Sequence, residues 1–145
     1  MRLLDVNVLV YAHRADSPHH DTCRRFLDDA VAGPALFGAP SLSLSGFIRV
    51  STHPRVFETP TPLDDALSFV AALTERPNFV TVEPGPRQWT IFTDLLRTAH
   101  ARGNLVPDAY LAAMAIETGS EWVTTDGDYA RFTGLRTVDP RNVTP

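Results

Sequence analysis

The sequence predicts an α/β sandwich, in which helices pack around a central, mostly parallel sheet. Short apolar segments alternate along the chain with longer segments whose apolar residues recur at helical spacing. This alternation is typical of parallel strands joined by helical crossovers. The length of 145 residues suits one domain. No internal repeat, low-complexity stretch or linker divides the chain, so a single domain is expected over residues 1–145.

The first part of the chain should form a strand, a helix, a second strand and a second helix. The apolar run over residues 3–10 is interpreted as a fully buried strand. Ser17 then provides an N-cap before a first-turn proline, and the helix that follows should end at Gly33. Residues 35–37 are a candidate second strand. The next helix should end near Thr52, before a histidine-proline pair.

A third helix should open at Pro62 and end before Pro77. A strand is expected over residues 79–82. The apolar positions of the helix between Pro62 and Pro77 are expected to face the core; they are Leu63, Ala66, Leu67, Val70 and Leu73.

The last part of the chain repeats the alternation. A helical pattern covers residues 84–102, and Pro107 begins another helix that Gly119 should close. Residues 122–124 form the next predicted strand, and a last extended piece lies around residues 136–138.

Asp5 is the residue that needs a chemical explanation, because it lies inside the first apolar run. A carboxylate removed from water costs several kcal/mol unless it is paired or bound to a cation. The run contains no arginine or lysine. Asp5 is therefore expected either to meet a metal ion or to be satisfied by a helix end and hydroxyl groups.

Two further acids are placed where they could join Asp5. Asp126 comes just after a predicted strand, and ligands of parallel sheets bind at the carboxyl ends of strands. Asp108 lies in the first turn of a predicted helix, where the helix dipole favours a carboxylate. Three such acids repel one another without a cation, and oxygen ligands select Mg²⁺ or Mn²⁺. Each acid also has a structural alternative: Asp108 as a first-turn acid, Asp126 as a turn residue, and Asp128 as the cap of residues 129–132.

Composition restricts the other possibilities. The formal net charge of -4 does not indicate a non-specific nucleic-acid binder. All 13 basic residues are arginines, and five of them could form a local phosphate-facing patch or be ordinary solvated residues: Arg14, Arg49, Arg55, Arg102 and Arg131. The single cysteine, Cys23, is expected in the core, which fits a reducing compartment. No segment has the length and apolarity of a membrane span or signal peptide, so a soluble, cytoplasmic protein is expected.

Three segments together resemble the PIN domains of VapC-type toxins. They are Leu4-Asp5-Val6-Asn7-Val8-Leu9-Val10, Val106-Pro107-Asp108-Ala109-Tyr110-Leu111-Ala112-Ala113 and Thr124-Thr125-Asp126-Gly127-Asp128-Tyr129-Ala130-Arg131-Phe132. Their order and spacing match over essentially the whole chain. A fourth segment, from Gly46 to Phe57, is similar to a mycobacterial-type branch of these toxins.

The resemblance implies a PIN-like three-layer α/β/α sandwich and an endoribonuclease that depends on Mg²⁺ or Mn²⁺. It implies that Asp5, Asp108 and Asp126 are catalytic metal ligands and that Asp128 is an auxiliary one. It further implies a VapB-type antitoxin whose C-terminal segment blocks the active site, an RNA substrate such as transfer or ribosomal RNA, and a homodimer. Candidate contact residues for these partners are residues 63–73 and the aromatic side chains Phe47, Phe57 and Phe69, although core packing explains these apolar residues equally well.

Supporting roles are expected around the acids. Asn7 and the hydroxyls of Thr124 and Thr125 could orient the carboxylates, or could make ordinary strand and turn hydrogen bonds. Arg49, Arg55 and Arg131 are the candidate RNA-binding residues.

The sequence departs from the family at Gly46, where many members have a glutamate three residues before the position of Arg49. No other acid lies between Asp29 and Glu58. One firmly held ion, with a second recruited by substrate phosphate, is one reading of this difference. Another is a weakened PIN-fold module that mainly binds its antitoxin.

Two other reaction types are less favoured. No serine or cysteine nucleophile with a paired histidine is apparent, and the five histidines show no ligand spacing tied to the acids, so histidine-based RNA cleavage is disfavoured. A phosphohydrolase with Asp5 as nucleophile is a third class, weakened because residue 7 is asparagine rather than a second aspartate.

Overall fold

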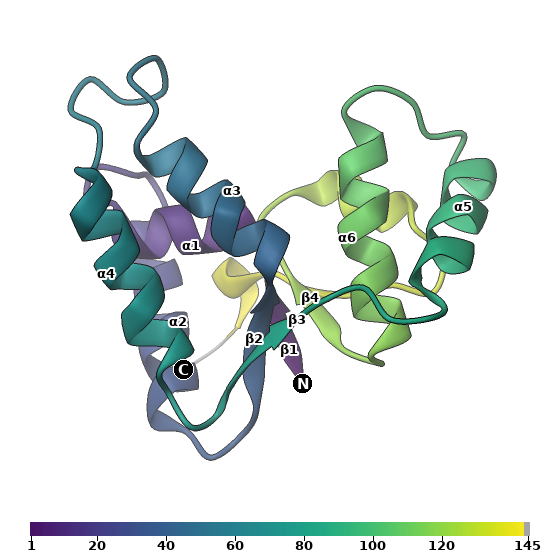
Figure 1. Ribbon diagram of the computed structural model, residues 1–145, viewed down its shortest axis with the longest axis horizontal. Coiled ribbons are helices and arrows are strands. Elements are labelled where there is room, and N and C mark those ends of the chain that lie inside the picture. Colours follow the sequence, from purple (N-terminus) through teal and green to yellow (C-terminus); the bar gives the residue numbers. More distant parts are fainter. Residues whose placement is uncertain (144–145) are drawn as a thin grey trace.

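A parallel sheet forms the centre of the protein, seen in a computed structural model that describes residues 1–143 (Figure 1). Within these residues five strands pair in the order β3-β2-β1-β4-β5, and every pairing is parallel. The strands are β1 (Arg2–Leu4), β2 (Phe37–Pro40), β3 (Phe79–Val82), β4 (Glu121–Val123) and β5 (Arg136–Val138).

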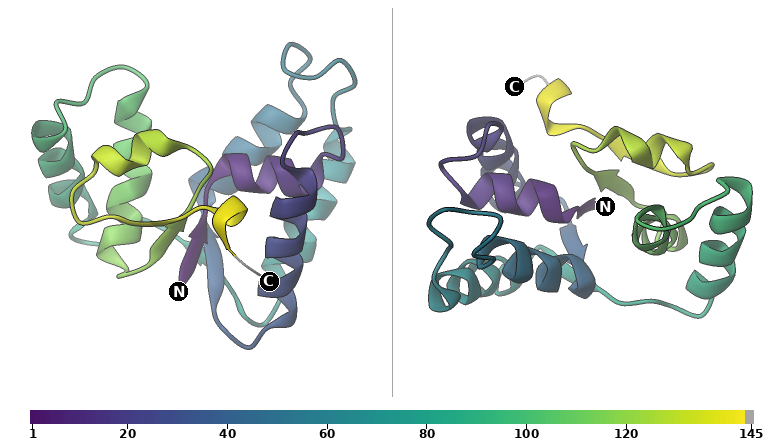
Figure 2. Two further views of the ribbon diagram at one scale, coloured as in Figure 1. Left: turned by 180° about the vertical axis from the view of Figure 1, so that it is seen from behind. Right: turned by 90° about the horizontal axis from the view of Figure 1, so that it is seen from above.

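Helices cover both faces of this sheet, so the predicted three-layer α/β/α sandwich is confirmed (Figures 1 and 2). Figure 1 shows α1 to α4 on one side and α5 with α6 on the other. The α-helices are α1 (Val6–His13), α2 (His20–Ala32), α3 (Ser41–Ser51), α4 (Leu63–Thr74), α5 (Gln88–Thr98) and α6 (Leu105–Glu117). Two short 3-10 helices follow β4 and β5, η1 (Gly127–Arg131) and η2 (Pro140–Asn142).

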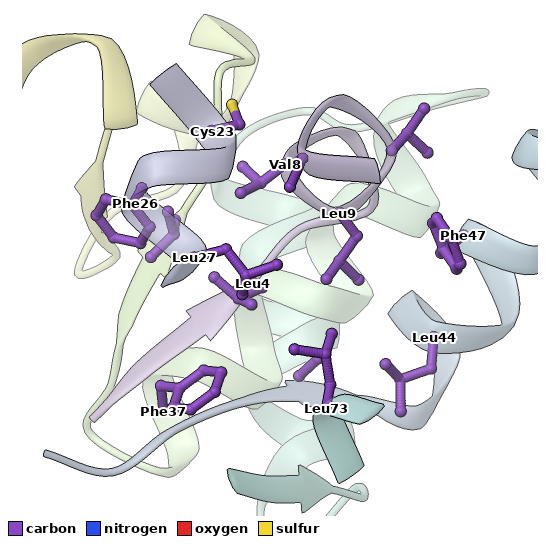
Figure 3. Close-up of a cluster of buried hydrophobic side chains, with 14 of the residues drawn as sticks. Leu4, Val8, Leu9, Cys23, Phe26, Leu27, Phe37, Leu44, Phe47 and Leu73 are labelled. Atoms are coloured by element: carbon purple, nitrogen blue, oxygen red, sulfur yellow. The ribbon is translucent and has the colours of Figure 1, made fainter. Parts of the chain in front are cut away.

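Two apolar cores lie on the two faces of the sheet, because successive residues of a strand point to opposite sides. Leu4 faces the core formed with α1 to α4, whereas its neighbour Leu3 faces the core formed with α5, α6 and η1. Figure 3 shows Leu4 packed among side chains of α1, α2 and β2. Cys23 is buried in this same core, as predicted.

The prediction of one strand over residues 3–10 is wrong. Only Arg2–Leu4 is a strand; Asp5 is extended, and α1 begins at Val6. A continuous apolar run cannot distinguish a buried strand from a buried helix by its pattern. The distinguishing residue is Asp5, whose carboxylate accepts a hydrogen bond from the amide of Val6 and so caps the helix.

The other elements agree with the predictions in type and differ mainly at their ends. The strand over residues 79–82 is confirmed, and Gly119 follows the end of α6 with a left-handed φ of 64°. The second strand lies at residues 37–40, slightly later than expected, and α5 is shorter than the pattern over residues 84–102.

The inward face predicted for α4 is only partly correct. Ala66 and Leu73 are buried, but Leu63 and Leu67 are exposed. No helix in the described part of the chain is both long and apolar enough to cross a membrane.

The strand order places a natural binding crevice between β1 and β4. From β1 the chain moves outward through β2 to β3, and it then returns to the other side of β1 and moves outward again through β4 to β5. Where this direction reverses, the connections after the two neighbouring strands leave toward opposite faces of the sheet. The gap beyond the carboxyl ends of such strands is where open α/β sheets bind ligands.

Candidate active site

Three aspartates meet at the crevice beyond β1 and β4. Asp5 follows β1, Asp126 follows β4 by three residues, and Asp108 lies in the first turn of α6. All three line one cleft of about 800 Å³. The structure therefore brings together the three acids that the sequence predicts as catalytic residues.

Asp5 is held by hydrogen bonds on both of its carboxylate oxygens. Its Oδ1 accepts from the Val6 amide at 2.7 Å, and its Oδ2 accepts from the Thr124 hydroxyl at 2.7 Å and from Asn7 Nδ2 at 3.0 Å. The side chain is only 5% exposed. The carboxylate thus has a fixed orientation at the end of the sheet, and it has no arginine partner among the described residues.

Asn7 ties the two strand ends together. Besides Asp5, its Nδ2 donates to Thr124 Oγ1 at 3.2 Å, and its Oδ1 accepts from the amide of Thr125 at 3.2 Å. The orienting roles expected of Asn7 and Thr124 therefore have a geometric basis. Thr125 takes part through its backbone and not, as expected, through its hydroxyl, for which the described residues provide no hydrogen bond.

Asp126 is fixed by the turn that follows β4. Its backbone amide donates to Thr124 Oγ1 at 3.1 Å, and its Oδ1 accepts from the amide of Asp128 at 2.9 Å. Asp126 is consequently the N-cap of η1, the role that the sequence suggested for Asp128. Asp128 itself is exposed and lines a neighbouring pocket instead of the cleft.

Tyr129 contributes to the site although sequence reasoning did not identify it. Its hydroxyl lies 3.4 Å from Asp108 Oδ1, a long hydrogen bond, and its ring is buried beside Trp122 and Phe132. An aromatic residue directly after the acidic Asp126-Gly127-Asp128 turn was the available signal. Tyr129 connects η1 to α6 and thereby connects the segments that carry Asp126 and Asp108.

The acids perturb one another. Burial raises the pKa of Asp5 from 3.8 to about 6; the hydrogen bonds from Thr124 and Val6 oppose this, and the charges of Asp108 and Asp126 add to it. The pKa of Asp108 is also raised, by burial and then by the charge of Asp126. The carboxylates of Asp5, Asp108 and Asp126 are therefore close enough to repel one another.

These residues suit a divalent cation in charge and in donor chemistry. Mg²⁺ and Mn²⁺ bind carboxylate oxygens, and a cation would offset both the burial that mainly raises the pKa of Asp5 and the smaller repulsion from Asp108 and Asp126. In residues 1–143 no three histidine, cysteine, aspartate or glutamate side chains are grouped closely enough to hold a metal ion as they stand. The acids thus line a common cleft, but their side chains do not form a complete set of metal ligands in this arrangement.

The arginines considered for phosphate binding fall into different positions. Arg49 is exposed on α3 and lines the cleft, whereas Arg131 lines the pocket next to it. Arg55 is exposed and lines neither.

Arg14 is a structural residue. It is 9% exposed, is paired with Asp16 at 2.6 Å and lies 3.9 Å from the centre of the Phe57 ring. Its NH1 group donates to the carbonyl of Thr59 and to the hydroxyl of Thr61. These contacts fasten the loop before α4 to the end of α1, so a phosphate-facing role for Arg14 is wrong.

Gly46 lines the cleft from α3, one helical turn before Arg49. A Cβ atom at this position would lie 2.7 Å from Cγ2 of Val6. Val6 is the first residue of α1 and follows Asp5 directly. The valine methyl group therefore occupies the space into which a side chain at position 46 would start, and α3 contributes no acid to the cleft.

Apolar side chains line the remainder of the cleft. They include Val10, Leu42, Val56, Phe57 and Leu111. Two of the aromatic residues proposed as partner contacts lie elsewhere: Phe47 is fully buried, and Phe69 packs against it with ring centres 4.8 Å apart. Only Phe57 of the three proposed aromatic residues faces the cleft.

The fold and the site together define an α/β/α protein with an acidic cleft at the switch point of its sheet. Residues 2–135 match the model of the PIN domain family. The chain is 41% identical over 140 residues to the ribonuclease VapC25 of Mycobacterium tuberculosis, covering 97% of this chain and 99% of that protein. It is 43% identical over 136 residues to the VapC ribonuclease Mb2897 of Mycobacterium bovis, covering 94% and 92%.

A solved structure gives the same fold. VapBC2 from Rickettsia felis, bound to a DNA fragment from its promoter, matches with a TM-score of 0.70 and 17% identity, over 95% of this chain and 97% of that chain. The protein therefore belongs to the PIN-domain family and, within it, to the VapC ribonucleases, the toxins of VapBC toxin-antitoxin systems.

Proposed function

We propose that this protein is an endoribonuclease toxin that cuts RNA phosphodiester bonds with the help of Mg²⁺ or Mn²⁺. The observation that supports this most strongly is the convergence of Asp5, Asp108 and Asp126 on one cleft at the switch point. These three residues would hold the cation. Asp128, which the resemblance also suggested, lies outside the cleft and is not included.

A bound Mg²⁺ or Mn²⁺ ion supplies an activated water and offsets the charge that develops on the phosphoryl oxygens. The side chains of the protein have the positioning roles. Thr124 and Asn7 hold the Asp5 carboxylate in one orientation through the hydrogen bonds to its Oδ2. Arg49, which lines the same cleft from α3, would contact a substrate phosphate. Cleavage would leave a 3′-hydroxyl and a 5′-phosphate.

One firmly held ion fits this cleft better than two. Its lining contains four acids, and one of them, Asp16, is already paired with Arg14. Three carboxylates remain, and the α3 wall provides Gly46 instead of a fourth. A second ion would have to take its remaining ligands from the substrate.

The antitoxin is the second proposed ligand of the cleft. The apolar residues that line the cleft with the acids, among them Val56 and Phe57, suit a segment of a VapB-type antitoxin that carries apolar side chains. Leu63 and Leu67 are exposed on α4 and are candidates for the contact between two copies of the chain. Transfer RNA and ribosomal RNA are the proposed substrate classes, with the cytoplasm as the location.

A direct test is RNA cleavage by the purified wild-type protein and by the variants Asp5→Asn and Asp126→Asn. With Mg²⁺ or Mn²⁺ present, the wild type should cut structured RNA and both variants should be inactive, with unchanged circular dichroism spectra. Undiminished cleavage by both variants, or equal wild-type cleavage in excess EDTA, would contradict the proposal. Sequencing of new 5′ ends after induced expression would identify the RNA.

Gly46 favours one alternative, a weakened PIN-fold protein that acts mainly by binding its antitoxin. This alternative predicts tight antitoxin binding together with an absence of divalent-dependent cleavage for every cellular RNA tested. A phosphohydrolase with Asp5 as nucleophile is a poor fit, because both oxygens of Asp5 accept hydrogen bonds and its side chain is 5% exposed.

A further inference from the structure

A second pocket lies beside the acidic cleft and is more polar. Its volume is about 530 Å³, and it is formed by the turn between α5 and α6 together with η1. We call it the polar pocket. The polar residues that line it are His100, Arg102, Asn104, Asp108, Asp128 and Arg131.

The polar pocket is connected to the candidate active site through Asp108. This residue lines both the cleft and the polar pocket. An extended ligand bound at the three acids could therefore continue past Asp108 into the polar pocket. A chain of nucleotides is such a ligand, whereas a small molecule bound at the acids would not need the second pocket.

Arg102 and Arg131 are the two arginines of the polar pocket, whose lining also contains the acids Asp108 and Asp128. Both arginine side chains are exposed, and neither forms an ion pair with another described residue. Five other arginines of the described chain do have acidic partners; they are Arg2, Arg14, Arg24, Arg97 and Arg141. A guanidinium group without an acidic partner remains available for the bidentate contact that arginine makes with phosphate.

The turn that carries Arg102 has a defined backbone. His100 has a left-handed φ of 49°, and the amide of Ala101 donates to the carbonyl of Leu96 at 2.9 Å. The amide of Leu105 then donates to the carbonyl of Arg102 at 3.3 Å, where α6 begins. Arg102 is thus presented from a hydrogen-bonded turn and not from a free loop, which reduces the entropy lost when it binds a ligand.

We propose that the polar pocket is a subsite for the RNA strand, in which Arg102 and Arg131 bind a phosphodiester next to the one that is cut. The inference rests on the proposed ribonuclease function and extends the substrate contacts from the cleft to the adjoining polar pocket. Asn104 and His100 would contact the sugar or base of the same nucleotide. Substrates that reach this pocket should bind more tightly than substrates that end at the acids.

Cleavage kinetics on two substrates test this inference. Both contain the same cut site; one is a 12-nucleotide RNA, and the other is reduced to the two nucleotides that flank the cut. Arg102→Gln and Arg131→Gln should each raise KM for the long RNA about 10-fold and leave kcat for this RNA nearly unchanged. For the short RNA, both KM and kcat should be nearly unchanged. Arg76→Gln, which removes an exposed arginine outside both pockets, is the matched control and should change neither parameter.

A binding measurement separates failure of this inference from failure of the ribonuclease proposal. Affinity for the fluorescently labelled 12-nucleotide RNA is measured against salt concentration in an Asp126→Asn background, which prevents cleavage. Each lost phosphate contact should reduce the slope of log K against log salt by about 0.7. Unchanged slopes in the Arg102→Gln and Arg131→Gln proteins, or equal KM increases on both substrates, would overturn the subsite. If the wild type does not cleave RNA but the Arg102→Gln and Arg131→Gln proteins still show reduced slopes, only the nuclease proposal is overturned.

Discussion

Thr124 donates its hydroxyl hydrogen bond to Asp5, with 2.7 Å between Thr124 Oγ1 and Asp5 Oδ2. The two residues are 119 positions apart in the chain, yet each directly follows one of the adjacent strands β1 and β4. The contact therefore holds the carboxylate at the point where the direction of the sheet connections reverses. It also removes part of the cost of burying Asp5.

Replacing Thr124 by valine should impair catalysis more than folding. Valine has nearly the shape of threonine but cannot donate to Asp5 or accept from the Asp126 amide. Loss of such an orienting group typically reduces metal affinity or activity by about 10–100-fold. The measurement is kcat/KM for RNA cleavage. Thr125→Val is the matched control, because only the backbone of Thr125 joins the network; an equal loss in both variants would refute the orienting role.

The pH dependence of stability should reveal the buried charge of Asp5 when divalent cations are removed. Its pKa is raised from 3.8 to about 6 in the folded protein, mainly by burial, so the folded state binds the proton more tightly than the unfolded state. The contribution of Asp5 is thus most favourable below pH 4 and is lost as the pH rises through 6. The difference corresponds to about 3 kcal/mol.

Urea denaturation in EDTA between pH 4 and pH 8 measures this effect. The free energy of unfolding of the wild type should fall with increasing pH relative to that of Asp5→Asn. Added Mg²⁺ should restore stability at pH 8 in the wild type but not in the variant. Parallel pH profiles for the two proteins would show that Asp5 does not carry the proposed buried charge.

Gly46→Ala should destabilise the protein although the same change normally stabilises a helix. The added Cβ would lie 2.7 Å from Cγ2 of Val6, inside the contact distance of the two atoms. We expect a loss of about 1–3 kcal/mol in the free energy of unfolding. The double variant with Val6→Ala should recover part of this loss in a double-mutant cycle. Additive effects in the cycle would show that the two residues do not compete for this space.

Leu4→Ala tests the core behind the site. Leu4 is 0% exposed and packs with α1, α2 and β2, so truncation should cost about 2–5 kcal/mol in the free energy of unfolding (Figure 3). Leu67→Ala on the surface of α4, where the side chain is 46% exposed, should cost much less. Similar losses for the two leucines in thermal or chemical denaturation would contradict the burial of Leu4.

Sequence patterns predict the layers of this fold well because amphipathic helices and turn residues have local signatures. The pattern does not reveal the beginning of α1, because Val6, Val8, Leu9 and Val10 are apolar in a run that fits a buried strand as well as a buried helix. The aspartates of the site were recognisable from their positions after strands and at a helix start. Tyr129 was missed because its contact with Asp108 depends on how η1 packs against α6, which no local pattern specifies.

The roles of the arginines also depend on packing that the sequence does not specify. The sequence alone does not distinguish the five arginines considered for phosphate binding: Arg14, Arg49, Arg55, Arg102 and Arg131. Only the tertiary structure separates Arg14, which is buried against Phe57, from Arg49, which is exposed at the cleft. A sequence pattern therefore identifies the chemistry of the candidate site more reliably than the residues that surround it.

Asp5, Asp108 and Asp126 are proposed to act together as one site for a divalent cation. Calorimetric titration of Mn²⁺ into the wild type and into Asp108→Asn tests it without requiring a known RNA substrate. Asp94→Asn, which removes an exposed acid of α5, is the control. We expect saturable binding of one ion by the wild type and by the control, and affinity at least about 10-fold weaker in Asp108→Asn. Equal Mn²⁺ affinity in Asp108→Asn and the wild type, or no saturable binding by the wild type, would contradict it.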